Sequence, residues 1–212
     1  HSGVRVSYAA VDSRDGTLYC CLDDGHFGCK FHRSDDLGGN WTEIPAPAYP
    51  AGAKLGNGQD AVLRYQWVLA PGAADQPGRI YIGTEPGGLF VSEDRGDSFT
   101  LNESLWNHPT RMEGWFGGGR DQPGIHSVFQ DPRNSQHLYI GISCAGVFFS
   151  PDDGATWEHS RVIHSGGSAY SCLVMLKSQE IGNLYEKDGY KRIVLARFDL
   201  DWVENKTSGK NK

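Results

Sequence analysis

The sequence lacks long hydrophobic runs and an excess of basic residues. No apolar stretch approaches the roughly 18–20 residues of a membrane-spanning helix, and the mean hydropathy is -0.48. The 212 residues include 20 Lys and Arg against 26 Asp and Glu, so the net charge is -6. Because nucleic-acid binding usually needs a basic surface, we expect no membrane and no nucleic acid among the partners of this protein.

Cysteine is also scarce, and the motifs of several common enzyme classes are missing. The five cysteines are odd in number and form no C-x-x-C pair, which argues against a zinc site and a complete disulfide framework. The sequence contains no G-x-S-x-G, no phosphate-binding loop, no H-E-x-x-H and no dinucleotide fingerprint, so those classes are not indicated. We therefore expect neither a metal nor a cofactor.

Glycine and aromatic residues, by contrast, are plentiful. The chain has 28 Gly, 6 Trp, 9 Tyr and 9 Phe, a combination that is typical of many short strands joined by tight turns. A chain of this length can bury a core of its own, as one domain or one compact array of repeats. The composition therefore predicts an all-β fold.

One eight-residue pattern, S-x-D-x-G-x-x-[W/F], occurs three times at a constant spacing. The copies begin at Ser34, Ser92 and Ser150, 58 residues apart each time, and such a period is typical of propellers and solenoids. An Asp in a tight turn can accept hydrogen bonds from backbone N–H groups, the Gly can adopt a positive φ, and the aromatic residue starts the next strand. We predict that each copy is the corner of a hairpin and makes no contact with a substrate.

These three corners resemble the Asp-box, or BNR, repeat of sialidase-like β-propellers. The resemblance implies an all-β propeller whose blades are four-stranded antiparallel sheets with Asp-box turns, and the strand pattern and the length of the chain give a small propeller of about four blades. We expect a single propeller domain at residues 1–203, with the last strand of the last blade at 200–203, and a polar, disordered tail at 204–212. From the strand pattern, the predicted blades span about residues 4–44, 61–101, 125–159 and 168–203.

The closing stretch, residues 166–202, resembles the final blade of exo-α-sialidases along its whole length, through its A-Y-S and L-Y-E motifs. In that family the tyrosine is the nucleophile and the glutamate is its companion, which implies these roles for Tyr170 and Glu186. A phenol suits an anomeric carbon that bears a carboxylate, because a neutral nucleophile approaches it without like-charge repulsion. Without the resemblance, Tyr170 would be interpreted as an ordinary strand aromatic.

Two further catalytic candidates follow from the resemblance at the start of the chain. Arg5, in V-R-V-S, stands where the family has the first of three arginines that hold the sugar carboxylate, and a guanidinium can bind a carboxylate bidentately. Asp24 stands in the loop from which the family takes its general acid, a role that needs a raised pKa. The alternative is that Asp24 has no catalytic role.

The middle of the chain does not match the catalytic middle of the family, so the other arginines and the base remain unassigned. Arg111, Arg120 and Trp115 are our candidates for substrate binding, because the long connection 105–124 mixes rings, charges and glycine, and long loops often carry function. The alternative is a solvated loop whose Trp side chains plug the propeller channel. Two glutamate–arginine pairs have a tolerable spacing for the missing roles: Glu85 with Arg111, and Glu103 with Arg120.

Three interpretations of the function remain open. The first is a retaining exo-α-sialidase that removes terminal sialic acid from glycoconjugates. The second is a BNR-repeat propeller without catalysis that binds a glycan or a protein, so the expected partner is a sialylated glycan or another carbohydrate. The third is a natural or engineered fusion of half-propellers that completes its ring as a homodimer. The enzyme requires that the first and last strands meet around a closed ring and bring Tyr170 near Arg5, since a fold alone does not define a function.

Overall fold

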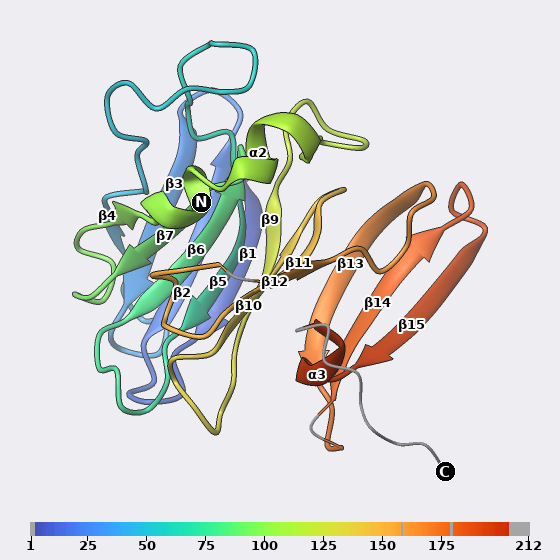
Figure 1. The fold of residues 1–212 in the computed structure, drawn as a ribbon. Coiled ribbons are helices and arrows are strands. Elements are labelled where there is room, and N and C mark those ends of the chain that lie inside the picture. The colour runs from blue at the N-terminus through green and yellow to red at the C-terminus, as the bar shows by residue number, and fades with distance from the viewer. Residues whose placement is uncertain (1–2, 158, 179, 204–212) are drawn as a thin grey trace.

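The protein consists of four antiparallel sheets that follow one another along the chain (Figure 1). The structure is a computed structural model, and it describes residues 3–157, 159–178 and 180–203. The first sheet contains β1 (Arg5–Val11), β2 (Leu18–Asp24), β3 (Gly28–Ser34) and β4 (Thr42–Ile44). The second contains β5 (Tyr65–Pro71), β6 (Ile80–Glu85), β7 (Leu89–Ser92) and β8 (Thr100–Leu101). The third contains β9 (Ile125–Gln130), β10 (Leu138–Ile142), β11 (Gly146–Ser150) and β12 (His159–Arg161). The fourth contains β13 (Ser168–Met175), β14 (Ile181–Lys187) and β15 (Arg192–Phe198).

The all-β prediction is confirmed, and each sheet is a meander in which strands pair in sequence order. The fourth sheet has three strands, because the segment expected as its last strand is the helix α3 (Leu200–Val203). The carboxylate of Asp199 accepts the backbone N–H of Trp202 at 2.9 Å, which is the geometry of a helix N-cap. The connection between the second and third sheets contains two more helices: α1 (Glu103–Trp106) and α2 (Pro109–Gly114). The predicted tail at 204–212 lies outside the described residues.

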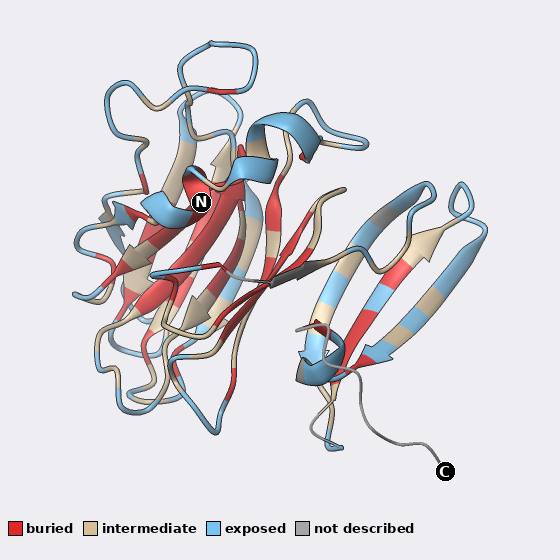
Figure 2. Cartoon of the chain, in the orientation of Figure 1, coloured by how far each residue is buried: buried red, intermediate tan, exposed pale blue. Residues whose placement is uncertain are grey.

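The core lies between the faces of successive sheets. Side chains alternate along a strand, so a sheet that is covered on both faces needs apolar residues on both. In the second sheet, Tyr81 packs with Ile140 and Phe148 of the third sheet, whereas its neighbour Ile82 packs with Phe31 of the first sheet. Figure 2 shows this central region as buried. The sheets therefore stack as blades, with β1, β5, β9 and β13 in contact one after the other.

The described residues form an open arc and not the closed ring that the sequence predicts. Figure 1 shows the fourth sheet set apart from the first, with β1 beside β5 and β13 beside β9. The outward faces of the two end sheets are consequently uncovered, as the exposures of Val6 (58%) and Leu184 (48%) illustrate. The expected meeting of the first and last strands is therefore absent from the described structure, because each blade packs only on its sequence neighbours. The homodimer that would cover these faces stays a prediction.

The three repeated turns share one set of hydrogen bonds. In the second copy, the Asp94 carboxylate accepts the backbone N–H of Ser98 at 2.9 Å. The hydroxyl of Ser92 accepts the N–H of Gly96 at 2.8 Å, and this glycine has a φ of +91°. These bonds occupy backbone donors that the turn would otherwise leave unpaired. The same bonds recur around the aspartates of the other two copies: Asp36 and Asp152.

Replacing the turn aspartate should destabilise the fold. Asp94→Ala removes the acceptor of the Ser98 N–H, so we expect the free energy of unfolding to fall by about 2 kcal/mol. Urea denaturation followed by circular dichroism measures this change. Asp97→Ala is the matched control, because the Asp97 carboxylate in the same turn is 59% exposed and pairs with Arg33 at 2.8 Å, while Arg33 keeps a second carboxylate partner in Asp35, so we expect a loss of less than about 1 kcal/mol. Equal losses for the two variants would contradict the role of Asp94.

Candidate functional site

The candidate site lies at one end of the sheets, which we call the loop face. It is formed by the turns between the second and third strands of each sheet and by the connections between sheets, 45–64 and 102–124. Antiparallel strands reverse direction at every turn, so these segments all gather at the end opposite the three repeated turns. Figure 1 shows α2 at this end of the molecule.

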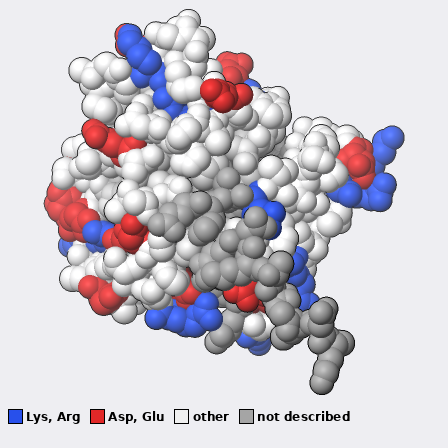
Figure 3. All heavy atoms as spheres, viewed as in Figure 1, with Lys and Arg blue, Asp and Glu red and all other residues white. Residues whose placement is uncertain are grey.

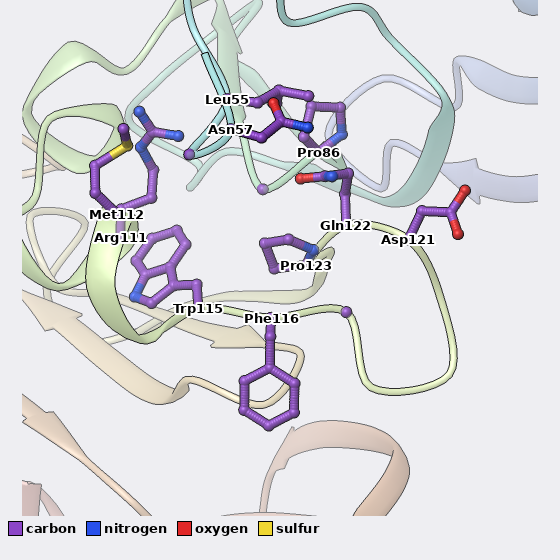
Figure 4. Close-up of a pocket in the computed structure, with 13 residues that line it drawn as sticks. Leu55, Asn57, Pro86, Arg111, Met112, Trp115, Phe116, Asp121, Gln122 and Pro123 are labelled. Carbon is purple, nitrogen blue, oxygen red and sulfur yellow. The ribbon is translucent and has the colours of Figure 1, made fainter. Parts of the chain in front are cut away.

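A pocket of about 200 Å³ opens on the loop face (Figure 4). Its lining combines aromatic rings with amide, carboxylate, guanidinium and thioether groups. Most of it comes from α2 and the segment that follows, and the rest comes from the first long connection and the β6–β7 turn. The lining residues are Leu55, Gly56, Asn57, Pro86, Gly87, Arg111, Met112, Trp115, Phe116, Gly117, Asp121, Gln122 and Pro123.

Trp115, which the sequence predicts as a substrate-binding residue, forms a rigid wall of this pocket. Its ring lies 5.3 Å from the ring of Phe148, and its indole N–H donates to the hydroxyl of Thr110 at 3.1 Å. The start of α2 positions Thr110 in turn. Pro109 is the first residue of this helix, and the side chain of the N-cap residue His108 accepts the Thr110 N–H. Trp115 is only 9% exposed, so these contacts determine the orientation of its ring before any ligand arrives, and the part that borders the pocket is apolar.

Arg111 lines the same pocket, but much of its guanidinium is already bonded. Its Nε donates to the carbonyl of Trp106, and its Nη2 donates to the carbonyl of Lys54 at 3.2 Å. The guanidinium also lies 3.8 Å from the centre of the Trp106 ring, which is a close cation–π contact. Burial lowers the pKa of Arg111, although an arginine stays charged at neutral pH. Arg111 therefore ties α2 to the first long connection.

Arg120 does not belong to the lining of this pocket. Its Nε donates to the carboxylate of Glu85, whose side chain is 4% exposed against 43% for Arg120. The guanidinium lies 5.0 Å from the ring of Tyr65 and 5.3 Å from the ring of Trp67. By their spacing, Glu103 and Arg120 are candidates for the unassigned base and arginine, and the structure pairs Arg120 with Glu85. Sequence reasoning missed the two rings, because strand aromatics usually belong to a core.

Arg5 and Asp24 both lie on the first sheet. Arg5 pairs with Asp23 of the neighbouring strand at 2.8 Å, and its side chain is 80% exposed. The Asp24 carboxylate accepts the backbone N–H groups of Phe27 and His26, each at 3.1 Å. These bonds lower the pKa of Asp24, whereas a general acid that works near neutral pH needs a raised one. In this structure Asp24 shapes its turn.

Tyr170 and Glu186 lie side by side on the fourth sheet. Ala169 pairs with Glu186 in the ladder, and the register shifts before Ser171, so Tyr170 is a bulged residue next to this pair. Tyr170 is 70% exposed. Within the described residues, Oε2 of Glu186 is buried and accepts no hydrogen bond. The structure thus places Tyr170 and Glu186 on neighbouring strands, while Arg5 lies three blades further along the arc.

Tyr170 is one of four bulged residues at matching positions. In every sheet the innermost strand shifts its register with the second strand at the same place. Bulges re-aim side chains and are frequent at barrel rims and beside active sites. Sequence reasoning missed this feature, because a bulge is defined by the register of the partner strand. The four residues are Ser7, Trp67, His126 and Tyr170.

His126 connects the third sheet to the fourth. Its Nε2 lies 3.1 Å from the hydroxyl of Ser171 on β13, and its Nδ1 lies 3.0 Å from the hydroxyl of Ser127. Burial lowers the pKa of His126 to about 4, well below the usual value of about 6.5. The imidazole is therefore neutral at pH 7 and serves the contact between the two blades.

The described residues offer no obvious place for a metal ion, since they include no group of three or more His, Cys, Asp or Glu side chains that could hold one. All five cysteines are free thiols. No helix in the described part of the chain has the length and apolar character needed to cross a membrane. Figure 3 shows acidic and basic side chains in small mixed groups on the face in view.

Comparison with known proteins finds similarity to a glycoside hydrolase. No protein-family model matches the chain. An oligoxyloglucan-reducing end-specific xyloglucanase from Emericella nidulans is 27% identical over 129 residues, which make up 60% of this chain. The match spans only 14% of the length of that enzyme, so the activity of the whole enzyme does not transfer directly to this chain.

Solved glycoside hydrolase structures share the fold. The GH74 xyloglucanase from Xanthomonas campestris aligns with a TM-score of 0.64 at 19% identity, over 91% of this chain and 29% of that one. The intramolecular trans-sialidase from Ruminococcus gnavus aligns with a TM-score of 0.53 at 20% identity, over 94% of this chain and 43% of that one. At such identities the likeness concerns the fold, and it supports a blade arrangement of the propeller type.

The buried His126 predicts a specific dependence of stability on pH. Below about pH 6.5 the unfolded chain takes up a proton at this residue, whereas the folded protein does so only near pH 4. The stability contributed by the neutral ring is therefore lost as the pH falls through this window, by about 3 kcal/mol in total. Urea denaturation at pH 7 and pH 4, compared with His126→Asn, isolates this loss. The same pH dependence in both proteins would contradict it.

Proposed function

We propose that this protein binds a neutral glucan of the xyloglucan type through the loop-face pocket, as the carbohydrate-binding part of a β-propeller glycoside hydrolase. The observation that carries the proposal is the lining of the pocket, where the rigid indole of Trp115 stands opposite the amides of Asn57 and Gln122 (Figure 4). Sugar rings have apolar faces that pack on aromatic rings and hydroxyls that exchange hydrogen bonds with amides. The similarity to a xyloglucanase supports this class of ligand.

The size of the pocket suits one sugar ring. Its volume of about 200 Å³ is below the roughly 300–1,000 Å³ of sites that enclose a drug-sized ligand. A branch or an end of a polysaccharide would therefore enter, while the rest of the chain lies on the surface. Phe116, which is 61% exposed beside the pocket, offers a second ring for the part of the glucan that stays outside.

The charges of the lining favour a neutral sugar over sialic acid. The charged lining residues are Arg111 and Asp121, which have opposite signs, and Arg111 already donates to two backbone carbonyls. A sugar carboxylate would lose its hydration without gaining a free guanidinium in return. A neutral sugar avoids this cost.

The same lining supports binding and not hydrolysis. Glycosidases that follow the common mechanism use a pair of carboxylic acids on either side of the scissile bond. Among the described residues that line the pocket, Asp121 is the one carboxylate. We therefore assign this pocket to recognition of the sugar and not to bond cleavage.

Removal of the Gln122 amide tests the site. Gln122→Ala deletes hydrogen-bonding groups from the pocket while it leaves the Trp115 wall in place, so we expect a xyloglucan oligosaccharide to bind about fivefold more weakly. Isothermal titration calorimetry measures the affinity. Gln136→Ala is the matched control, since Gln136 is exposed between β9 and β10, at the opposite end of the sheets. Equal affinity for both variants, or no binding by the unmodified protein, would overturn the proposal.

An exo-α-sialidase is the second candidate function. It is favoured by one specific observation: the exposed Tyr170 and the unpaired carboxylate oxygen of Glu186 belong to neighbouring strands, where Tyr170 is bulged next to the Ala169–Glu186 pair. A carboxylate next to a phenol can take its proton and so activate the oxygen as a nucleophile. The placement of Arg5 three blades away counts against this function, because no guanidinium from β1 stands beside Tyr170 in the arc.

If the chain is a sialidase, its activity depends on the phenol oxygen of Tyr170. Tyr170→Phe removes the nucleophile and keeps the ring, so release of 4-methylumbelliferone from its α-sialoside should fall to background if the chain has this activity. Tyr190→Phe provides the control, since Tyr190 is exposed (66%) in the turn between β14 and β15. Fluorescence measures the rate. No release by the unmodified protein, or the same rate after Tyr170→Phe, would exclude this mechanism.

A further inference from the structure

Two segments that are far apart in the sequence form opposite sides of the pocket, and one ion pair joins them. Glu85 is the last residue of β6, and the two residues that follow it, Pro86 and Gly87, line the pocket. Arg120 belongs to the connection between α2 and β9, here called the site loop (residues 115–124). Neither Glu85 nor Arg120 is part of the lining, although both adjoin it. The site loop contributes Trp115, Phe116, Gly117, Asp121, Gln122 and Pro123 to the lining.

The position of Arg120 is determined by side chains of the second sheet. Glu85 is a nearly inaccessible carboxylate, and a buried charge needs a partner. Arg120 donates to it while its guanidinium lies over the rings of Tyr65 and Trp67 on β5. A planar guanidinium can pair at its edge and stack on its face at once. Three side chains from β5 and β6 therefore hold one residue of the site loop.

The backbone transmits this anchor to the rest of the loop. The N–H of Arg120 donates to the carbonyl of Gly117 at 3.1 Å, which closes a turn. A Cβ atom on Gly117 would lie 1.9 Å from the carbonyl oxygen of Arg120 and 2.8 Å from that of Gln122. The turn is therefore packed so closely that only glycine fits at its start. The position of Arg120 therefore also determines the positions of Gly117 before it and of Asp121 and Gln122 after it, which line the pocket.

We propose that Arg120 is the positioning residue of the sugar site. It holds the site loop against β5 and β6 and so shapes the pocket, without touching the sugar itself. This assignment rests on the proposed function of the pocket, and it differs from the direct substrate contact that the sequence predicts for Arg120. The pocket then exists only while the site loop is held against the second sheet. A bound sugar therefore favours the held loop, and the held loop favours sugar binding.

Limited proteolysis tests the anchor without any ligand. Trypsin can cut after Arg120 only when the loop leaves the second sheet, and cleavage of native protein follows the population of such local openings. Glu85→Gln keeps the shape of the side chain and removes its charge. We expect cleavage after Arg120 to become about tenfold faster, which corresponds to an opening that is about 1.4 kcal/mol easier. Cleavage after Lys177, exposed on the fourth sheet, should keep its rate, and mass spectrometry separates the two products.

The control and a second variant distinguish an anchor from a general loss of stability. Glu113→Gln makes the same chemical change on an exposed residue of α2 and should leave both rates unchanged. Arg120→Lys keeps the charge and the trypsin site but loses the planar stacking group, so its effect should lie between those of the unmodified protein and Glu85→Gln. Equal acceleration after Arg120 and after Lys177 would show a merely structural role and overturn the proposal.

Sugar affinity completes the test. Titration with the xyloglucan oligosaccharide should rank the proteins in the same order as their resistance to cleavage, with Glu85→Gln weakest. A variant that opens the loop and keeps full affinity would overturn the positioning role. Should the unmodified protein bind no xyloglucan, the proposed function fails and cleavage after Arg120 alone decides about the anchor. If Glu85→Gln does not melt cooperatively, Trp67→Phe reduces the stacking surface and leaves the ion pair in place.

Discussion

The packing of apolar sheet faces on one another is the interaction on which the rest of this structure depends. Tyr81 and Ile82 are neighbours on β6, both are fully buried, and they belong to different cores on opposite sides of the second sheet. Burial of large side chains on both faces supplies most of the stabilisation of such a fold. It also sets the inner strands side by side. The connections at one end of the strands are thereby brought together as the loop face.

The blades determine the geometry of the pocket, although its residues lie on the connections between strands. Trp115 packs against the ring of Phe148 in the third sheet, and Arg120 forms an ion pair with Glu85 in the second sheet. Backbone of irregular segments needs such side-chain anchors, because it lacks the regular hydrogen bonds of a sheet. The site is therefore as well defined as the strands beneath it. Asp24 differs, since its carboxylate accepts hydrogen bonds from the backbone of its own turn and, among the described residues, anchors no other segment in this way.

The sequence predicted local features well and distant partners poorly. The repeated turns around Asp94 follow from a pattern of eight residues, because every bond in them joins near neighbours. The Glu85–Arg120 pair joins residues 35 positions apart, and nothing in the local sequence around either residue indicates the other as its partner. Tyr170 and Glu186, which the motifs of the closing stretch imply as a functional pair, lie on the neighbouring strands β13 and β14 of one hairpin, and their roles stay a prediction.

The sequence by itself determined the all-β class, the repeated turns and the order of the sheets, because strand alternation and turn chemistry act over a few residues. Only the tertiary structure decided that the last segment is a helix after Asp199, that the sheets form an open arc, and that the blades of Arg5 and Tyr170 lie at opposite ends of this arc. These outcomes depend on the sum of many contacts between distant side chains, and no short stretch of sequence contains that sum.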